Sequence, residues 1–255
     1  MRLQRQADEL APDSLALLDR VGLRSGHSAI DLGCGPRGIL ELLAERVAPD
    51  GRVVGLDAEP AHTAMAAQFA AERRLSTVEC ATADARHTVL RSGSFDLVHC
   101  RTLLVNIPAP TEVVAEMARL ARPGGWVAAM EPDSEYAMCY PPNPAFTRIC
   151  EIFPAVFGRN GADHMIGRRV AELFRRVGLT DVGVEVRAQM YPPGHSRRTT
   201  RLDLIRSMRP HILRLGLASE AELDELDTAA RAHLDDPRTV AVFGLFFLTW
   251  GRKPA

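Results

Sequence analysis

The stretch Ala29–Gly38, AIDLGCGPRG, predicts the fold of the chain. An apolar approach leads into a glycine turn and then into an amphipathic run from about Ile39, an order that indicates strand, turn and helix. Glycines suit such a turn because they allow positive φ and let a ligand approach the backbone closely. A helix opening at Arg37 directs free N–H groups and its positive dipole end into the same space. The stretch therefore predicts a site for an anionic ligand group.

Taken alone, this turn is compatible with more than one class of nucleotide-binding enzyme. Gly33, Gly35 and Gly38 satisfy G-x-G-x-x-G, and Asp57 follows near the roughly 20-residue offset of the ribose-binding acid in dinucleotide folds. An NAD(P)-dependent oxidoreductase is therefore one interpretation. Asp31 stands shortly before the first glycine and argues against it, because a dinucleotide fold gives an acid there no specific role.

The composition is that of an ordinary globular chain with no strong overall charge. The chain has 255 residues, 46% of them hydrophobic and 25% charged, with a formal net charge of -1. We expect one domain over residues 1–255 that favours neither nucleic acid nor an anionic membrane. The 5 cysteines form no C-x-x-C pair, which argues against a disulfide framework and a structural zinc site. We therefore expect a cytoplasmic protein with no metal and no membrane-spanning segment.

Strand and helix signals alternate along the rest of the chain. After the first strand, further strands are expected at 52–57, 78–83, 95–100, from about 126 onward, 182–191 and 239–250. Helices are expected at 39–47, 60–74, 112–120, 145–157, 167–177, 197–215 and 220–234, with one or two more before the first strand. Ser219 and Glu222 form a capping box at the start of the last helix.

Four motifs in order over 29–131 resemble those of the class I S-adenosylmethionine-dependent methyltransferases. The first is Asp31 before the glycine turn. The second is the pair of acids that follow the second and third strands, Asp57 and Asp84. The third is Phe95-Asp96 at the start of the fourth strand, and the fourth is the P-G-G turn within 121–127 that leads into the fifth strand. The resemblance implies a type 11 methyltransferase domain. Its α/β fold is then Rossmann-like and doubly wound, with a mostly parallel seven-stranded sheet, an antiparallel last strand and helical lid insertions.

The resemblance also implies a set of residues that hold S-adenosylmethionine, which leaves as S-adenosylhomocysteine. In the family, the acid after the second strand binds the ribose hydroxyls and the acid after the third reaches the adenine amino group. The implied cofactor-binding residues are Asp31, Gly33, Cys34, Gly35, Asp57, Ala58, Asp84, Ala85, Cys100 and Arg101. Gln4 and Gln6 either close over the methionine end of the cofactor or lie on a solvated helix face.

Segments outside the core 29–131 are expected to cover the site. They are a helical preamble 1–28, an insertion 132–166 after strand five and a helical insertion 196–237 between strands six and seven. If strand six is parallel to the others, both insertions emerge at the carboxyl edge of the sheet, above the ligand. Their aromatic and methionine residues favour an apolar organic substrate, with packing onto the sheet as the alternative.

Methyl transfer needs alignment of the nucleophile with the methyl carbon, and a hydroxyl, phenol or carbon acceptor also needs a base. The candidate catalytic residues are His195, Tyr140 and Asp133. His195 follows strand six at the expected edge of the site, and a loop hydrogen bond is its alternative role. His62 is expected at the surface and His99 inside strand four.

We expect a monomer or homodimer that methylates a small organic acceptor on O, N or C in bacterial secondary metabolism. A protein that binds S-adenosylmethionine without methyl transfer remains an alternative. The sequence contains no N-P-P-Y-like motif where strand four ends, at Cys100 and Arg101, which disfavours adenine or glutamine nitrogens as acceptors.

Overall fold

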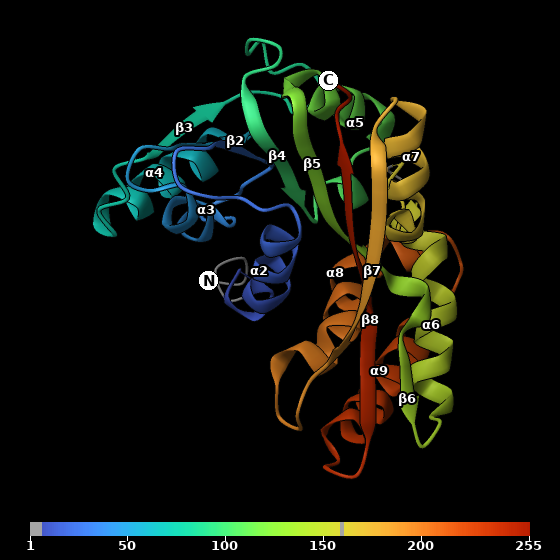
Figure 1. Ribbon diagram of the computed structural model, residues 1–255. Helices are drawn as coiled ribbons and strands as arrows, with labels where there is room; N and C mark the ends of the chain where they lie inside the picture. Colours follow the sequence, from blue (N-terminus) through green and yellow to red (C-terminus); the bar gives the residue numbers. More distant parts are fainter. Residues whose placement is uncertain (1–6, 159–160) are drawn as a thin grey trace.

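The computed structural model describes residues 7–158 and 161–255. Its centre is an eight-stranded sheet in the order β3-β2-β1-β4-β5-β8-β6, with β7 along the other side of β8 (Figure 1). The strands are β1 (Ser28–Leu32), β2 (Arg52–Asp57), β3 (Val78–Thr82), β4 (Phe95–Arg101), β5 (Ala121–Asp133), β6 (Met138–Tyr140), β7 (Thr180–Met190) and β8 (Val240–Arg252).

The strand directions confirm the doubly wound fold that the sequence predicts. Strands β1 to β5 are parallel to one another, and β8 is antiparallel both to β5 and to β7. Strand β7 therefore runs in the direction of the parallel strands, as expected for strand six. The carboxyl ends of β1 to β5 and of β7 face the same edge of the sheet, where α/β folds bind their ligands.

Helices cover both faces of the sheet. Helices α5 (Pro110–Leu120) and α7 (Val170–Arg176) bury apolar side chains against one face. Helices α2 (Ala11–Arg20) and α3 (Leu40–Val47) do so on the opposite face, and α4 (Pro60–Glu72) packs beside β2 and β3. This two-sided burial explains why the parallel strands read as continuous apolar runs.

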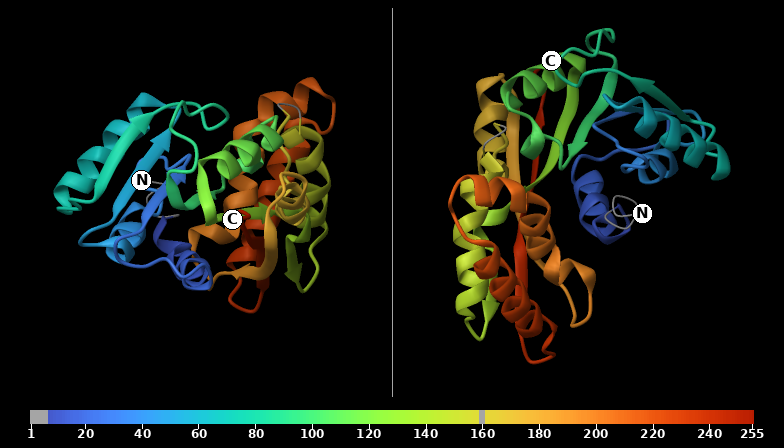
Figure 2. Two further views of the ribbon diagram at one scale, coloured as in Figure 1. Left: turned by 45° about the horizontal axis from the view of Figure 1, so that its top comes forward. Right: turned by 180° about the vertical axis from the view of Figure 1, so that it is seen from behind.

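Three further helices form a helical layer of their own: α6 (Pro144–Phe157), α8 (Thr200–Arg214) and α9 (Glu220–Asp235). They pack on one another around buried side chains such as Phe153, Leu202 and Leu234. Figure 2 shows this layer gathered along the part of β8 that extends beyond β5. Ser219 Oγ accepts the Glu222 N–H at 3.1 Å, so the predicted cap of α9 is present.

The structure corrects three details of the sequence prediction. The sheet has eight strands instead of seven, because β6 continues the line of β5 along β8 and is too short to show a periodic pattern. Helix α3 begins at Leu40 instead of Arg37, because Gly38 has φ +53°, which no right-handed helix accommodates. A 3-10 turn, η4 (Ile166–Arg169), precedes the short α7. Gln4 and Gln6 lie outside the described residues.

Within the described ranges, no helix combines the length and the apolar character needed to cross a lipid bilayer.

Candidate functional site

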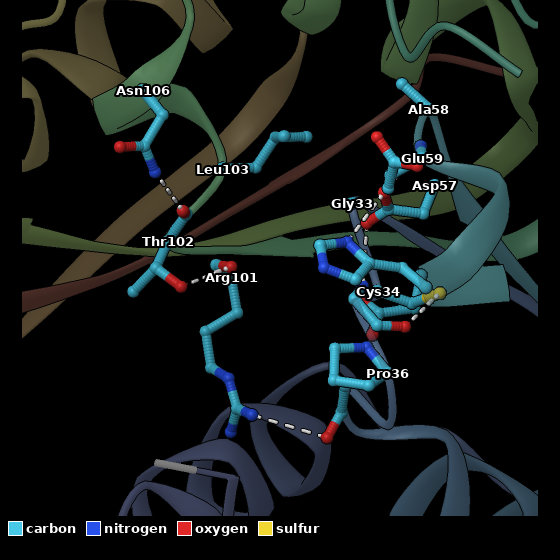
Figure 3. Close-up of a pocket in the computed structure, with 14 residues that line it drawn as sticks. Gly33, Cys34, Pro36, Asp57, Ala58, Glu59, Arg101, Thr102, Leu103 and Asn106 are labelled. Carbon is cyan, nitrogen blue, oxygen red and sulfur yellow. Dashed lines mark hydrogen bonds and ion pairs between the residues drawn. The ribbon is translucent and has the colours of Figure 1, made fainter. Parts of the chain in front are cut away.

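A first cavity of about 350 Å³ lies at the carboxyl ends of β1, β2 and β4 (Figure 3). Most of the expected cofactor-binding residues line it, namely Asp31, Gly33, Cys34, Gly35, Asp57, Ala58 and Arg101. The segment after β4 forms the facing wall with Thr102, Leu103 and Asn106. The cavity is large enough for a drug-sized ligand and lies where open α/β sheets bind theirs.

Asp31 holds the glycine turn in place. Its carboxylate is buried, and Oδ2 accepts the backbone N–H of Ile39 at 3.1 Å. Oδ1 lies 2.8 Å from Nδ1 of His99, which is fully buried in β4 as expected. A Cβ on Gly38 would stand 2.3 Å from Asp31 Oδ2, so the carboxylate occupies the space that the third glycine leaves free. Asp31 therefore links β1, β4 and the start of α3.

Asp57 connects the end of β2 to the same turn. Its Oδ2 accepts the N–H of Gly35 at 2.8 Å, and Oδ1 accepts the N–H of Glu59 at 2.9 Å. His62 Nδ1 lies 3.2 Å from Oδ1. Because a carboxylate has about four lone-pair positions, Asp57 keeps capacity for further donors at the cavity.

Arg101 brings positive charge to the cavity. Its guanidinium donates to Ser14 Oγ at 3.0 Å and to the Gly38 carbonyl at 3.3 Å, and Figure 3 shows it extending toward the glycine turn. No carboxylate forms an ion pair with Arg101 in the part of the chain that the structure describes. Burial lowers the pKa of Arg101, the nearby Asp31 carboxylate opposes this effect, and Arg37 and Arg197 add like charge. An anionic ligand group is the complement that this arrangement lacks.

Glu131 supports the wall that faces the glycine turn. It is fully buried at the end of β5 and accepts three backbone N–H groups from Leu103, Leu104 and Val105 at 2.9 to 3.1 Å. The last two residues belong to the 3-10 turn η1 (Leu104–Asn106). Burial raises the pKa of Glu131 to about 7, against the opposing effect of the three N–H donors.

Three of the expected cofactor-binding residues do not line the first cavity. Asp84 is half-exposed and paired with Arg86, which lowers its pKa to about 2. Ala85 is buried in the core, and the fully buried Cys100 points its thiol toward Glu131 at 3.9 Å. Burial raises the pKa of Cys100 well above its usual value, so its thiol stays protonated.

The three candidate catalytic residues lie apart from the first cavity. Asp133 is fully buried and bound by Arg168, with 2.9 Å between Nη2 and Oδ1. Tyr140 is 64% exposed on β6. His195 stacks on Tyr191 with ring centroids 4.7 Å apart, and its Nδ1 accepts the Arg197 N–H at 3.2 Å. Their catalytic roles stay predictions.

Glu59 and His62 also line the cavity, although His62 was expected at the surface. The first turn of α4 follows the end of β2 closely and places His62 beside Asp57. His62 follows Asp57 by five positions, and this spacing after a strand-ending acid is the sequence signal for the contact. In the described ranges, no cluster of three or more His, Cys, Asp or Glu side chains is arranged to hold a metal.

Comparisons with known proteins match the motif-bearing part of the chain. A family model described as a methyltransferase domain matches residues 30–129. The chain is 42% identical over 122 residues to the nocamycin O-methyltransferase of Saccharothrix syringae, covering 48% of this chain and 43% of that protein. It is 28% identical over 186 residues to the demethylmenaquinone methyltransferase of Halalkalibacterium halodurans, covering 66% of this chain and 74% of that protein.

The fold has relatives among solved structures. Phosphoethanolamine N-methyltransferase 2 of Haemonchus contortus, solved with phosphomonomethylethanolamine and S-adenosylhomocysteine, matches with a TM-score of 0.60 at 19% identity. The match covers 96% of this chain and 53% of that chain. This chain spans about half the length of several curated relatives that it matches. Residues 30–129 therefore match a methyltransferase domain in sequence, and the chain shares the fold of solved methyltransferases.

Proposed function

We propose that the first cavity binds S-adenosylmethionine and that the protein transfers its methyl group to a small organic acceptor. The observation that carries the proposal is the convergence of Asp57, the glycine turn and the unpaired Arg101 on one cavity. When bound, the sulfonium supplies a methyl carbon that bonds to the acceptor's electron pair while the carbon–sulfur bond breaks toward sulfur and the acceptor's proton passes to water.

The residues present fit this cofactor. Asp57 has a lone pair left on Oδ2 for a ribose hydroxyl, while Gly35, Glu59 and His62 contact the rest of its carboxylate. Arg101 offers a guanidinium to the carboxylate of the methionine part. The glycine turn brings backbone close to the ligand without a Cβ. Asp84 reaches the adenine amino group in this proposal only after releasing Arg86, because that arginine now occupies its carboxylate.

The acceptor is a small molecule methylated on O, N or C, within bacterial secondary metabolism. Two relatives, a nocamycin O-methyltransferase and a demethylmenaquinone methyltransferase, are named for methylation of small organic molecules, which supports an acceptor of that class. The half-length overlap with the first of them makes this support a guide to acceptor class only.

The test is calorimetric titration of the purified chain with S-adenosylmethionine, S-adenosylhomocysteine, NAD and NADP. We expect binding of the two sulfur ligands and none of the nicotinamide cofactors. Binding of NAD or NADP alone would mean that the G-x-G-x-x-G match reflects a dinucleotide site, and the proposal would then fail.

A further inference from the structure

A second cavity of about 710 Å³ lies next to the first. Its walls come mainly from the end of α6 and from one face of α8. These two helices are distant in sequence and lie together because they pack in the helical layer. In α8 the lining residues Ser207, Met208 and His211 fall within about one helical turn of each other, so they share a face.

The two cavities meet at Asn106. This residue lines both of them, and its Nδ2 donates to the Thr102 carbonyl at 3.0 Å. The backbone N–H of Asp163 donates to the Val105 carbonyl at 3.2 Å, which attaches the segment after α6 to η1. Asn106 therefore borders both cavities, and a molecule in the second lies beside the Asn106 wall of the first.

The wall of the second cavity combines apolar and uncharged polar groups. Val156, Phe157 and Met208 supply apolar surface, and Asn106, Ser207 and His211 supply polar groups. No Asp, Glu, Lys or Arg lines it among the described residues. An ionised ligand group finds no ion-pair partner among these residues. Such a wall favours an uncharged molecule that has both apolar and polar parts.

His211 gives this wall a defined hydrogen-bond donor. Its Nδ1 lies 2.7 Å from Nη2 of Arg214. A guanidinium only donates, so Nδ1 accepts and the ring hydrogen of the neutral imidazole is on Nε2. The Ser207 hydroxyl already donates to the Leu204 carbonyl at 2.7 Å and therefore offers an acceptor. A donor from His211 and an acceptor from Ser207 together match a ligand hydroxyl, which both accepts and donates.

We propose that the second cavity binds the methyl acceptor and that this acceptor is an uncharged molecule with an apolar part and an alcohol or phenol hydroxyl. The inference rests on the proposed function, and it narrows the methylated atom of the acceptor from O, N or C to oxygen. It also assigns the acceptor to residues of α6 and α8 instead of His195, Tyr140 and Asp133, which line neither cavity.

The test uses two aromatic probes that differ in charge. The full chain, saturated with S-adenosylhomocysteine, is titrated calorimetrically with 2-naphthol and with 2-naphthoate. We expect 2-naphthol to bind and 2-naphthoate to bind at least about tenfold more weakly, because none of the described residues that line the cavity is a cation able to receive the carboxylate.

Two variants block the cavity from α8. Met208→Trp fills it from a half-buried position, and Ser207→Phe does so from an exposed one that leaves the packing of α8 intact. Met138→Trp is the matched control, because Met138 is half-exposed on β6 and lines neither cavity. We expect the first two to weaken 2-naphthol binding at least about tenfold and the control to leave it unchanged, with S-adenosylhomocysteine binding the same in all three.

Separate outcomes test the two proposals. If S-adenosylhomocysteine does not bind the wild-type chain, the proposed function itself is wrong. If it binds but 2-naphthol does not, or if 2-naphthol binds equally to the wild type and both blocked variants, only the assignment of the second cavity is wrong. Displacement of S-adenosylhomocysteine by 2-naphthol also overturns that assignment, because the two cavities would then not be occupied together.

Discussion

The two cavities share Asn106, yet their walls are built in different ways. The first is made by short segments at strand ends, where Asp31 and Asp57 bind backbone N–H groups of the glycine turn. The second is made by faces of α6 and α8, which are far apart in sequence and held by apolar packing. A wall of directed hydrogen bonds fixes the geometry of one ligand, whereas a wall of mixed side chains without charged groups among the described residues selects ligands by size and charge.

The largest loss of stability is expected at Gly38, where the wall of the first cavity has no room for an added side-chain atom. Gly38→Ala adds a Cβ 2.3 Å from Asp31 Oδ2 and 2.8 Å from the Cys34 carbonyl, at a φ of +53°. Strain at positive φ and overpacking together should lower the free energy of unfolding by about 4 kcal/mol. Urea denaturation measures this loss, and S-adenosylhomocysteine binding should fall with it because the turn shifts.

Gly26→Ala is the control for this effect. Gly26 also has positive φ, +80°, but an added Cβ meets nothing within 4 Å. Gly26→Ala should lower the free energy of unfolding only by the backbone strain, about 1 kcal/mol. Equal losses in the two variants would show that Asp31 does not constrain the turn and that the first wall is as adaptable as the second.

The next largest change in stability is expected at Glu131, which supports the cavity wall that faces the glycine turn. Its pKa is raised to about 7 in the folded state, above the usual 4.5. The folded state therefore holds the proton more tightly than the unfolded one. Protonated Glu131 therefore adds on the order of 3 kcal/mol to the free energy of unfolding below about pH 4.5. This contribution is lost as pH rises through about 7. Glu131→Gln should remove this pH dependence in urea denaturation between pH 4.5 and 7.5.

Glu116→Gln provides a control of opposite sign. Glu116 is also buried, but Arg119, followed by Thr88, lowers its pKa to about 2. Its stabilisation is present above about pH 4.5 and is lost only as pH falls toward 2. The variant should therefore be less stable than the wild type with an unchanged slope from pH 4.5 to 7.5. A changed slope in this variant, or an unchanged one in Glu131→Gln, would contradict the prediction.

Arg101→Ala tests the charge of the first wall. Removing a charge-assisted hydrogen bond to a carboxylate costs about 2 kcal/mol, so S-adenosylhomocysteine should bind roughly 30-fold more weakly. 5′-Methylthioadenosine lacks the amino-acid part and should bind Arg101→Ala as it binds the wild type. Arg37→Ala is the control, since Arg37 is already paired with Asp8 and Glu41. Equal weakening of both ligands in Arg101→Ala would place the guanidinium away from the methionine part.

The contrast between the walls also explains what the sequence predicts well. The positions of the strands and the cap of α9 follow from contiguous patterns, and the structure confirms them. The antiparallel direction of the last strand is implied by the family resemblance, and the structure confirms it as well. The residues of the glycine turn are placed together because they are neighbours in the chain. The contact between Asp31 and His99 instead depends on the register of β1 against β4, which no local pattern encodes.

The rest depends on where distant segments pack. His62 reaches the first cavity through the entry angle of α4, and Tyr140 is carried away from it because β6 extends along β8. Similarly, Met208 and Phe157 line one cavity only because α6 and α8 pack together. Apolar residues on a helix indicate that the helix is buried, but they do not indicate its partner.

The smallest expected effect tests whether the two walls act independently. Ser219→Ala removes the hydroxyl that caps α9 at 3.1 Å, which should lower the free energy of unfolding by about 1 kcal/mol, while Ser219→Asp keeps an acceptor and should cost less. Helix α9 packs on α6 and α8 but contributes no residue to the first cavity. Calorimetry should therefore show the same affinity for S-adenosylhomocysteine in both variants. If Ser219→Ala weakens that affinity by more than about twofold while Ser219→Asp does not, the packing of the helical layer reaches the glycine turn, and the separation of the two walls fails.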